Sequence, residues 1–241
     1  MGRTTPKSAQ MHPGPGYRIR KSVERPDGSI VKQFLGFDAP AVSDMLNRMY
    51  TMDSGIRSMT DNVPLVGTAC TVKVFPGDNL MVHKALDVAK PGDVIVIDGG
   101  SSSMNALIGD LITTKAKHRG VVGFVVDGLI RDVEEVRKVG LPVFARGITP
   151  IGPLHRGPGE INFEVSCGGI VVNPGDIIVA DMNGVVVIRR NFASEVLERL
   201  YAQKQSLEEY ESQVKQGNFS NAWADEYLKM TQCNIEGDHL L

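Results

Sequence analysis

Two short motifs of this sequence place acidic and basic side chains where they could bind a metal ion and an acidic substrate. Gly109-Asp110 is followed, after twenty intervening residues, by Arg131-Asp132. Two carboxylates suit a hard divalent cation that keeps several of its waters. The guanidinium of Arg131 suits the anionic oxygens of a chelated 2-oxo acid. The residue types are therefore compatible with metal-assisted chemistry on a 2-oxo acid, without being specific to it.

Each motif also has an ordinary structural interpretation. Asp110 fits an exposed carboxylate on a helix, and Asp132 forms a D-x-x-E pattern with Glu135, in which it would cap a helix. The motifs are more informative together, because each lies beyond an apolar run, Val94–Ile97 or Val121–Val126. These runs are predicted to be neighbouring parallel strands, which would let the two aspartates converge on one cation.

A second candidate is the loop Asp98-Gly99-Gly100-Ser101-Ser102-Ser103, which follows an apolar strand and precedes a predicted helix. Ligands bind at such strand ends, and free amides at a helix N-terminus attract carboxylate or phosphate. The alternative is an ordinary connecting loop. The stretch has neither GxGxxG nor GxxxxGK[ST], which argues against a specific nucleotide site.

The elements that would position these motifs alternate along the middle of the chain. Strands are predicted at 70–75, 94–97, 121–126 and 142–144. Helices are predicted at 79–88 and 132–139, and a third helix is predicted to begin between residues 103 and 109 and to end near residue 118. Further strands at 170–172, 177–180 and 185–188 are joined by Asn-Pro-Gly-Asp and Asp-Met-Asn-Gly, which favour an antiparallel arrangement. We therefore expect a mixed α/β fold.

The two ends of the chain extend this core. Residues 1–16 are expected to be a loosely held arm, followed by a hairpin in which strands 17–24 and 29–34 flank Arg-Pro-Asp-Gly. This extension could dock on a neighbouring subunit. A helix is expected from Asp38 to Met49, and a long one from Asn191 to about Gln216, stopped by Gly217.

Composition narrows the class of protein. The chain has 241 residues and a formal net charge of -2 with no basic stripe, which argues against a nucleic-acid partner. The three cysteines are odd in number and widely spaced, typical of reduced cytosolic thiols and not of nucleophiles. No apolar run reaches membrane-spanning length and the first residues lack a signal-peptide core, so we expect a soluble cytoplasmic protein with no membrane partner.

The two motifs, with their spacing, resemble the RraA-like family and within it the class II 4-hydroxy-4-methyl-2-oxoglutarate and 4-carboxy-4-hydroxy-2-oxoadipate aldolases. The resemblance extends from Val42 to Arg190. It includes Pro76-Gly77-Asp78-Asn79, Val126-Asp127-Gly128, Cys167-Gly168-Gly169, Pro174-Gly175-Asp176 and Gly184-Val185-Val186-Val187, in addition to Asp98-Gly99-Gly100.

The resemblance implies a fold and an assembly. The fold would be an α-β-β-α sandwich with a swivelling β/β/α-type core and a long C-terminal helix. Residues 1–37 would form an arm and hairpin, 38–190 the catalytic core, and 191–241 a helical extension. Trimers or hexamers would carry their sites between subunits.

The resemblance also implies roles for individual residues. Asp132 would ligate Mg²⁺ or Mn²⁺, Asp110 would hold metal-bound water, and Arg131 would bind the pyruvyl oxygens. Backbone amides at Gly109 and Leu111 would receive the substrate carboxylate. A glutamate from a neighbour's C-terminal helix would approach the metal-bound water, and Glu208 matches it better than do the glutamates at 209 and 211.

The implied activity is retro-aldol cleavage of a 4-hydroxy-2-oxo acid to release pyruvate, with oxaloacetate decarboxylation as a side activity. The alternative is a noncatalytic regulator, because the family also contains proteins that bind the endoribonuclease RNase E. Some of these lack the aspartate after the arginine, which this chain retains as Asp132. The segment 147–162 departs from the aldolase pattern: His155, Arg156 and Glu160 would either extend the pocket or lie in a solvated loop.

Overall fold

The computed structural model describes residues 10–61, 63–234 and 236. The chain forms two compact units, residues 1–200 and residues 201–241. The candidate motifs at 109–110 and 131–132 both belong to the first unit.

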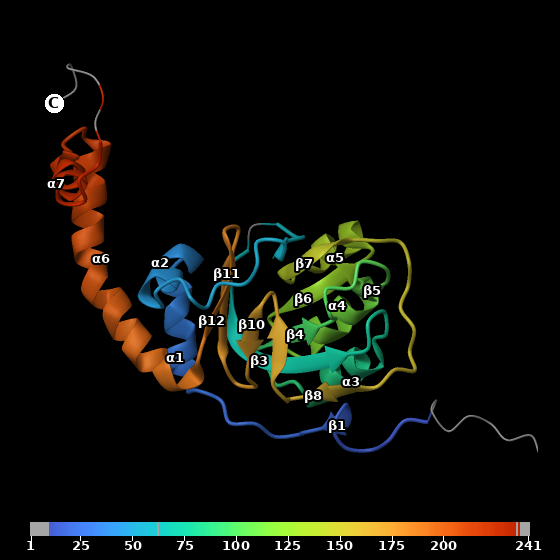
Figure 1. The fold of residues 1–241 in the computed structure, drawn as a ribbon. Helices are drawn as coiled ribbons and strands as arrows, with labels where there is room; N and C mark the ends of the chain where they lie inside the picture. Colours follow the sequence, from blue (N-terminus) through green and yellow to red (C-terminus); the bar gives the residue numbers. More distant parts are fainter. Residues whose placement is uncertain (1–9, 62, 235, 237–241) are drawn as a thin grey trace, which may run out of the picture. The chain divides into compact units, whose positions relative to one another are not determined.

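A row of parallel strands forms the centre of the first unit (Figure 1). Its order is β3 (Leu65–Val74), β4 (Asp93–Asp98), β6 (Gly123–Ile130) and β7 (Val143–Ile148). Strands β3, β4 and β6 are almost wholly buried, which explains why they are mostly apolar without strict alternation, whereas β7 is buried only in its first half. The crossover helices α3 (Leu80–Val88), α4 (Asp110–His118) and α5 (Val133–Val139) cover one face and share its hydrophobic core.

A second β-layer covers the other face. It consists of β9 (Val165–Cys167), β10 (Ile170–Val172), β11 (Ile177–Asp181) and β12 (Gly184–Ile188). Their inward side chains, such as Ile178 and Val187, pack against Val96, Val125 and Phe144 of the central strands. Strand β3 belongs to both layers, because its first half also pairs antiparallel with β11.

Short helices cover the outside of β11 and β12. They are α1 (Gly28–Gln33), η2 (Phe34–Gly36), α2 (Ala39–Met45), η3 (Arg190–Phe192) and the first turns of α6 (Ala193–Lys215). Phe34, Val42 and Leu197 are buried here against Val179 and Val186. The layers therefore follow the order helices, sheet, sheet, helices, and the α/β fold expected from the sequence is confirmed.

Short strands complete the edges of the sheet. β1 (Tyr17–Ile19) pairs in parallel with β8 (Gly159–Ile161), which is antiparallel to the end of β3. β2 (Arg57–Ser58) lies on the opposite edge beside β7, and β5 (Ala106–Ile108) pairs with the end of β6.

The predicted N-terminal hairpin is wrong. Only residues 17–19 form a strand, and its partner is β8 of the same chain. Residues 28–33 are helical because the Asp27 side chain caps the first turn by accepting a hydrogen bond from the Ser29 amide, and Val31 is buried.

Helix α2 and strand β10 also differ from the sequence prediction, α2 in its length and β10 in its partner strand. Asp38 does cap a helix, but α2 ends at Met45, and Asn47 and Arg48 adopt positive φ. Strands β11 and β12 form the expected antiparallel pair, whereas β10 pairs with β9 through the tight Gly168-Gly169 connection and not with β11.

The second unit contains the rest of α6 and α7 (Ala222–Met230). Gly217 has a positive φ and follows the end of α6, as expected. The described apolar side chains of the second unit are all at least partly exposed, among them Leu207, Tyr210, Trp223 and Tyr227. Across the part of the chain that is described, no helix is both long and apolar enough to span a bilayer.

Candidate functional site

Strand β5 brings the two motifs together. It pairs in parallel with the end of β6, with Ile108 opposite Ile130, and the Arg131 amide donates a hydrogen bond of 3.1 Å to the Ile108 carbonyl. The chain therefore leaves two adjacent strand ends as Gly109-Asp110 and Arg131-Asp132. The sequence predicted this convergence, but from the wrong strands: β4 and β6 are neighbours, yet Asp110 is positioned by β5, which the apolar pattern did not reveal.

Asp132 does not cap the helix that follows it. It occupies the N-cap position of α5 with φ 54° and ψ 40°, in the left-handed region, and its side chain makes no capping hydrogen bond. The carboxylate instead lies 3.3 Å from the Arg131 Nε and is partly exposed. A non-glycine residue in this region costs about 1 kcal/mol or more, and such residues cluster at functional sites.

Gly109 allows the Asp132 carboxylate to approach the start of α4. A Cβ atom on Gly109 would lie 2.6 Å from Asp132 Oδ2 and 3.2 Å from Arg131 Cγ. The first amides of α4, from Asp110 to Ile112, lie N-terminal to the first intrahelical hydrogen bond, which Thr113 donates to Gly109. This helix end therefore presents backbone donors and a favourable dipole for an anion.

Asp110 and Arg131 lie between two hollows. The larger, about 630 Å³, also includes Asp132, Thr149 and Pro150. The smaller, about 220 Å³, is lined by the first turn of α4 together with residues of α3 and of the loop before β8. A ligand held by Arg131 could therefore extend to either side.

Three polar residues of the smaller hollow were not identified from the sequence as a group. His155 Nδ1 lies 2.7 Å from Asn79 Oδ1, and Asn79 Nδ2 donates to the Leu107 carbonyl at 2.9 Å. The rings of His83 and His155 meet edge to face, 5.6 Å apart. Burial lowers the pKa of His83, and the neighbouring His155 and Lys115 lower it further. The only sequence signal was the spacing of Asn79 and His83, one helical turn apart.

Of the three polar residues that the sequence singled out in segment 147–162, Arg156 and Glu160 do not line either hollow. The Arg156 amide donates to Asp78 Oδ2 at 2.6 Å, and Glu160 is held by the Arg18 guanidinium and the Gly16 amide at the outer edge of the sheet. His155 alone of the three extends the pocket.

The glycine-serine loop after β4 uses its amides within the protein. No helix follows it directly, because β5 intervenes. The Gly100 amide donates to Asp98 Oδ1 at 3.0 Å, and the Ser101 amide donates to the Asp127 carbonyl at 3.2 Å. The anion site expected at a helix N-terminus is therefore absent from this loop.

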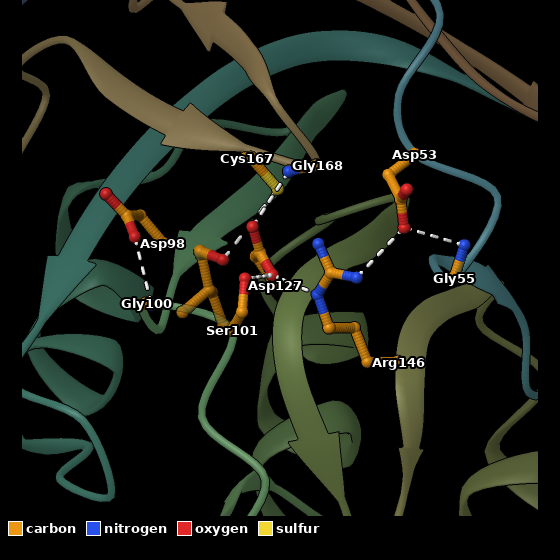
Figure 2. A network of polar contacts seen from close by, with 10 residues as sticks. Asp53, Gly55, Asp98, Gly100, Ser101, Asp127, Arg146, Cys167 and Gly168 are labelled. Atoms are coloured by element: carbon orange, nitrogen blue, oxygen red, sulfur yellow. Dashed lines mark hydrogen bonds and ion pairs between the residues drawn. The ribbon is translucent and has the colours of Figure 1, made fainter.

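A polar network anchors this loop to the second β-layer. Figure 2 shows Asp127 between the Ser101 hydroxyl, the Gly168 amide and the Arg146 guanidinium, which also reaches Asp53 at 3.0 Å. Hydrogen bonding to Asp127 raises the pKa of Arg146. Burial raises the pKa of the adjacent Cys167 thiol well above its usual range, in agreement with the expected inert thiol. This network supports the fold and lines neither hollow.

The donor set at the two strand ends fits Mg²⁺ or Mn²⁺. Among the described residues no group of three or more His, Cys, Asp or Glu side chains could hold a metal. Asp110 and Asp132 thus offer two carboxylates, which suits cations that are bound by few protein ligands and keep their waters. Glu208 and the glutamates at 209 and 211 lie exposed on α6 in the second unit, and their role stays a prediction.

Known proteins share this sequence and fold. The sequence model of the RraA-like family, Aldolase/RraA, matches residues 39–187. A Halalkalibacterium halodurans protein named "Putative 4-hydroxy-4-methyl-2-oxoglutarate aldolase" is 41% identical over 169 residues, covering 70% of this chain and 80% of that protein.

Two solved structures extend the likeness to regulators. RraAS2 of Streptomyces coelicolor, described as an unusual member of the RNase ES inhibitor RraA family, is 28% identical, with a TM-score of 0.73. The alignment covers 79% of this chain and 99% of that one. The RNA-processing inhibitor RraA from Thermus thermophilis is 30% identical with a TM-score of 0.59, covering 63% and 92% respectively.

Proposed function

Because the chain belongs to the RraA-like family, we propose that it is a metal-dependent lyase that cleaves a 4-hydroxy-2-oxo acid and releases pyruvate. One observation carries the proposal: Gly109-Asp110 and Arg131-Asp132 leave paired strand ends, with the Asp132 carboxylate against the backbone of Gly109. Mg²⁺ or Mn²⁺ would be held directly by Asp132 and through water by Asp110. Such a metal, when bound, would stabilise the negative charge that develops on the 2-oxo group.

The protein's own groups would bind and orient the pyruvyl end of the substrate. The Arg131 guanidinium can donate two parallel hydrogen bonds to a carboxylate or to adjacent oxygens. The amides of the first turn of α4, around Leu111, can receive the C1 carboxylate at the positive end of the helix dipole. Together they would hold the substrate beside Asp110, which borders both hollows.

Cleavage then requires the loss of a proton from the C4 hydroxyl, the breaking of the C3–C4 bond and the return of one proton to C3. The C4 hydroxyl loses its proton to Asp110, directly or through a water, and becomes a carbonyl as the C3–C4 bond breaks. The electron pair passes to C3 as the enolate of pyruvate, and protonation at C3 completes the product. Arg131 would stabilise the enolate oxygens. Oxaloacetate reaches the same enolate by losing carbon dioxide, so we propose its decarboxylation as a side activity.

The direct test is pyruvate release by protein that has been stripped of metal. We expect no turnover of oxaloacetate or of a panel of 4-hydroxy-2-oxo acids until Mg²⁺ or Mn²⁺ is added, after subtraction of the rate that metal alone gives in solution. Asp44→Asn, at an exposed carboxylate of α2 that pairs with Arg48, is a suitable control and should show the metal dependence of the wild type. Undiminished enzymatic turnover without metal would refute the metal requirement, and failure on every substrate would refute the lyase.

The solved relatives named as inhibitors of RNA processing supply the rival function, a noncatalytic regulator. It predicts that the protein captures a ribonuclease and releases no pyruvate. Retained binding after Asp132→Asn, with no lyase activity in the wild type, would favour the regulator.

A further inference from the structure

A basic cavity lies apart from the Asp110 and Arg131 site. Its volume is about 530 Å³, and it shares no lining residue with either hollow of that site. The N-terminal segment between β1 and α1 forms one wall, and the turns before β11 and after β12 form the other. Three arginines, Arg20, Arg189 and Arg190, line the cavity together with the carboxylates of Glu24 and Asp176 and with Ser22 and Phe192.

The walls of this cavity are fixed by hydrogen bonds to the core. The Arg20 amide donates to the Ile161 carbonyl at 3.0 Å, and Asn162 Nδ2 donates to the Arg20 carbonyl at 2.9 Å. On the facing wall, the buried Asp176 accepts from Arg189 at 2.8 Å. The cavity is therefore a feature of the folded unit and not a gap beside a loose arm.

The cavity carries an excess of positive charge. Arg189 is offset by Asp176, and Arg190 pairs with Glu24 at 2.9 Å. The Arg20 guanidinium lies over the Phe163 ring, 4.3 Å from its centroid, and has no carboxylate partner in the described part of the chain. Stacking on a ring leaves the edge N–H groups of a guanidinium available to an anion.

We propose that this cavity binds a phosphorylated small molecule. Arginines on both walls, Arg20 on one and Arg189 and Arg190 on the other, suit the several oxygens of a phosphate, to which a guanidinium can donate paired hydrogen bonds. The Ser22 hydroxyl adds a neutral hydrogen-bonding group. The volume falls in the range of small-molecule sites, and Phe192, 49% exposed, offers an apolar surface to the organic part of the ligand.

The test is calorimetric titration of the full chain with inorganic pyrophosphate, with citrate as a carboxylate comparison. We expect saturable one-to-one binding of pyrophosphate, weakened about tenfold by Arg20→Gln. Lys21→Gln is the matched control: it removes the same charge from the next residue, which does not line the cavity, and should change affinity less than about twofold. Circular dichroism verifies that both variants are folded.

Several outcomes would overturn the proposal. Absence of saturable binding up to about 10 mM pyrophosphate would contradict the proposal, because a dissociation constant above that concentration is too weak for a specific site. Equal weakening by Arg20→Gln and Lys21→Gln would assign the effect to the diffuse field of the surface. Tighter binding of citrate than of pyrophosphate would contradict the phosphate assignment. Hydrogen exchange that slows on binding near residues 20–24 and 173–192 would support it.

Discussion

Asp132 holds a left-handed backbone conformation and gains no capping hydrogen bond from it. A non-glycine residue in this conformation carries backbone strain, and such strain is common where a side chain must be oriented toward a ligand. The conformation points to the carboxylate, and not to the start of α5, as the reason for an aspartate here. The D-x-x-E pattern favoured a cap, and only the backbone angles distinguish the two roles.

Asp132→Asn should leave the fold intact and reduce turnover about a hundredfold or more, equivalent to about 3 kcal/mol of transition-state stabilisation. Asparagine tolerates the left-handed region, so the free energy of unfolding should change little. Because the variant lacks a charged ligand, the Mg²⁺ concentration for half-maximal rate should rise. Rate against metal concentration measures this; wild-type turnover with wild-type metal dependence would remove Asp132 from the site.

Arg131→Lys should also lower turnover about a hundredfold, but for a different reason. Lysine keeps the charge and loses the planar fork that can hold two substrate oxygens. The loss should therefore persist at saturating metal, unlike that of Asp132→Asn. A variant rescued fully by added Mg²⁺ would show that Arg131 acts through the metal and not on the substrate.

Gly109→Ala tests the close approach of the two motifs. The new Cβ would meet Asp132 Oδ2 at 2.6 Å, so the flexible carboxylate must move away. We expect a Mg²⁺ requirement raised about tenfold or more, with little change in the free energy of unfolding measured in urea. Gly28→Ala is the control, because its Cβ would meet nothing within 4 Å. An unchanged metal requirement would show that Asp132 need not contact this backbone.

At the scale of elements, an ion pair with a buried carboxylate helps to attach residues 20–27 to the core. Arg25 contacts both carboxylate oxygens of Asp93, at 2.9 and 2.7 Å, and Asp93 is fully buried and also accepts from Thr68 and the Lys90 amide. The pair raises the pKa of Arg25. Its loss would leave a buried carboxylate without its counter-charge.

Arg25→Ala should therefore destabilise the protein by about 3 kcal/mol, since removing one partner of a buried pair leaves the other uncompensated. Arg48→Ala is the comparison, because its pair with Asp44 is exposed and should contribute less than about 1 kcal/mol. Urea unfolding of both variants measures the difference. Equal losses would mean that Arg25 contributes no more than a surface charge.

The sequence predicted elements well where one local signal was decisive. Asp38 caps α2, as its position before the apolar helical spacing predicted, and the apolar runs of β4 and β6 are of strand length and too short for ordinary helices. Strand β5 was missed because three apolar residues after a glycine-serine loop have no period. Asp27 was taken for a turn residue because its capping role depends on Val31 being buried in the hydrophobic cluster between the outer helices and β11 and β12, a tertiary contact. The Asn79, His83 and His155 group was missed for the same reason.

At the scale of the whole molecule, apolar side chains surround the candidate site without cover. Leu111, Ile148, Ile151 and Leu154 are each more than half exposed, next to residues that line the two hollows. Exposed apolar groups concentrated in one area usually mark an interface. We propose that a second copy of the chain covers them, in a trimer or hexamer.

Light scattering at micromolar concentration should then show an assembly of three or six chains.

Removal of residues 201–241 retains every buried side chain of the first unit's core and deletes Glu208. If Glu208 completes a neighbour's site, the truncated protein should remain folded but lose most turnover, and Glu208→Gln should do the same without affecting assembly. Full activity in a monomer would contradict both expectations.

Strand β3 has a consequence for how the chain is made. Val66 finds its partner Val179, and Lys73 its partner Glu160, only after roughly a hundred further residues have been synthesised. A nascent chain on the ribosome therefore carries an open, apolar strand edge until β8 and β11 emerge, and pairing at such separation folds slowly. Strand β1 must also wait for β8, so a strand that is translated before the central sheet pairs only after most of that sheet has been made.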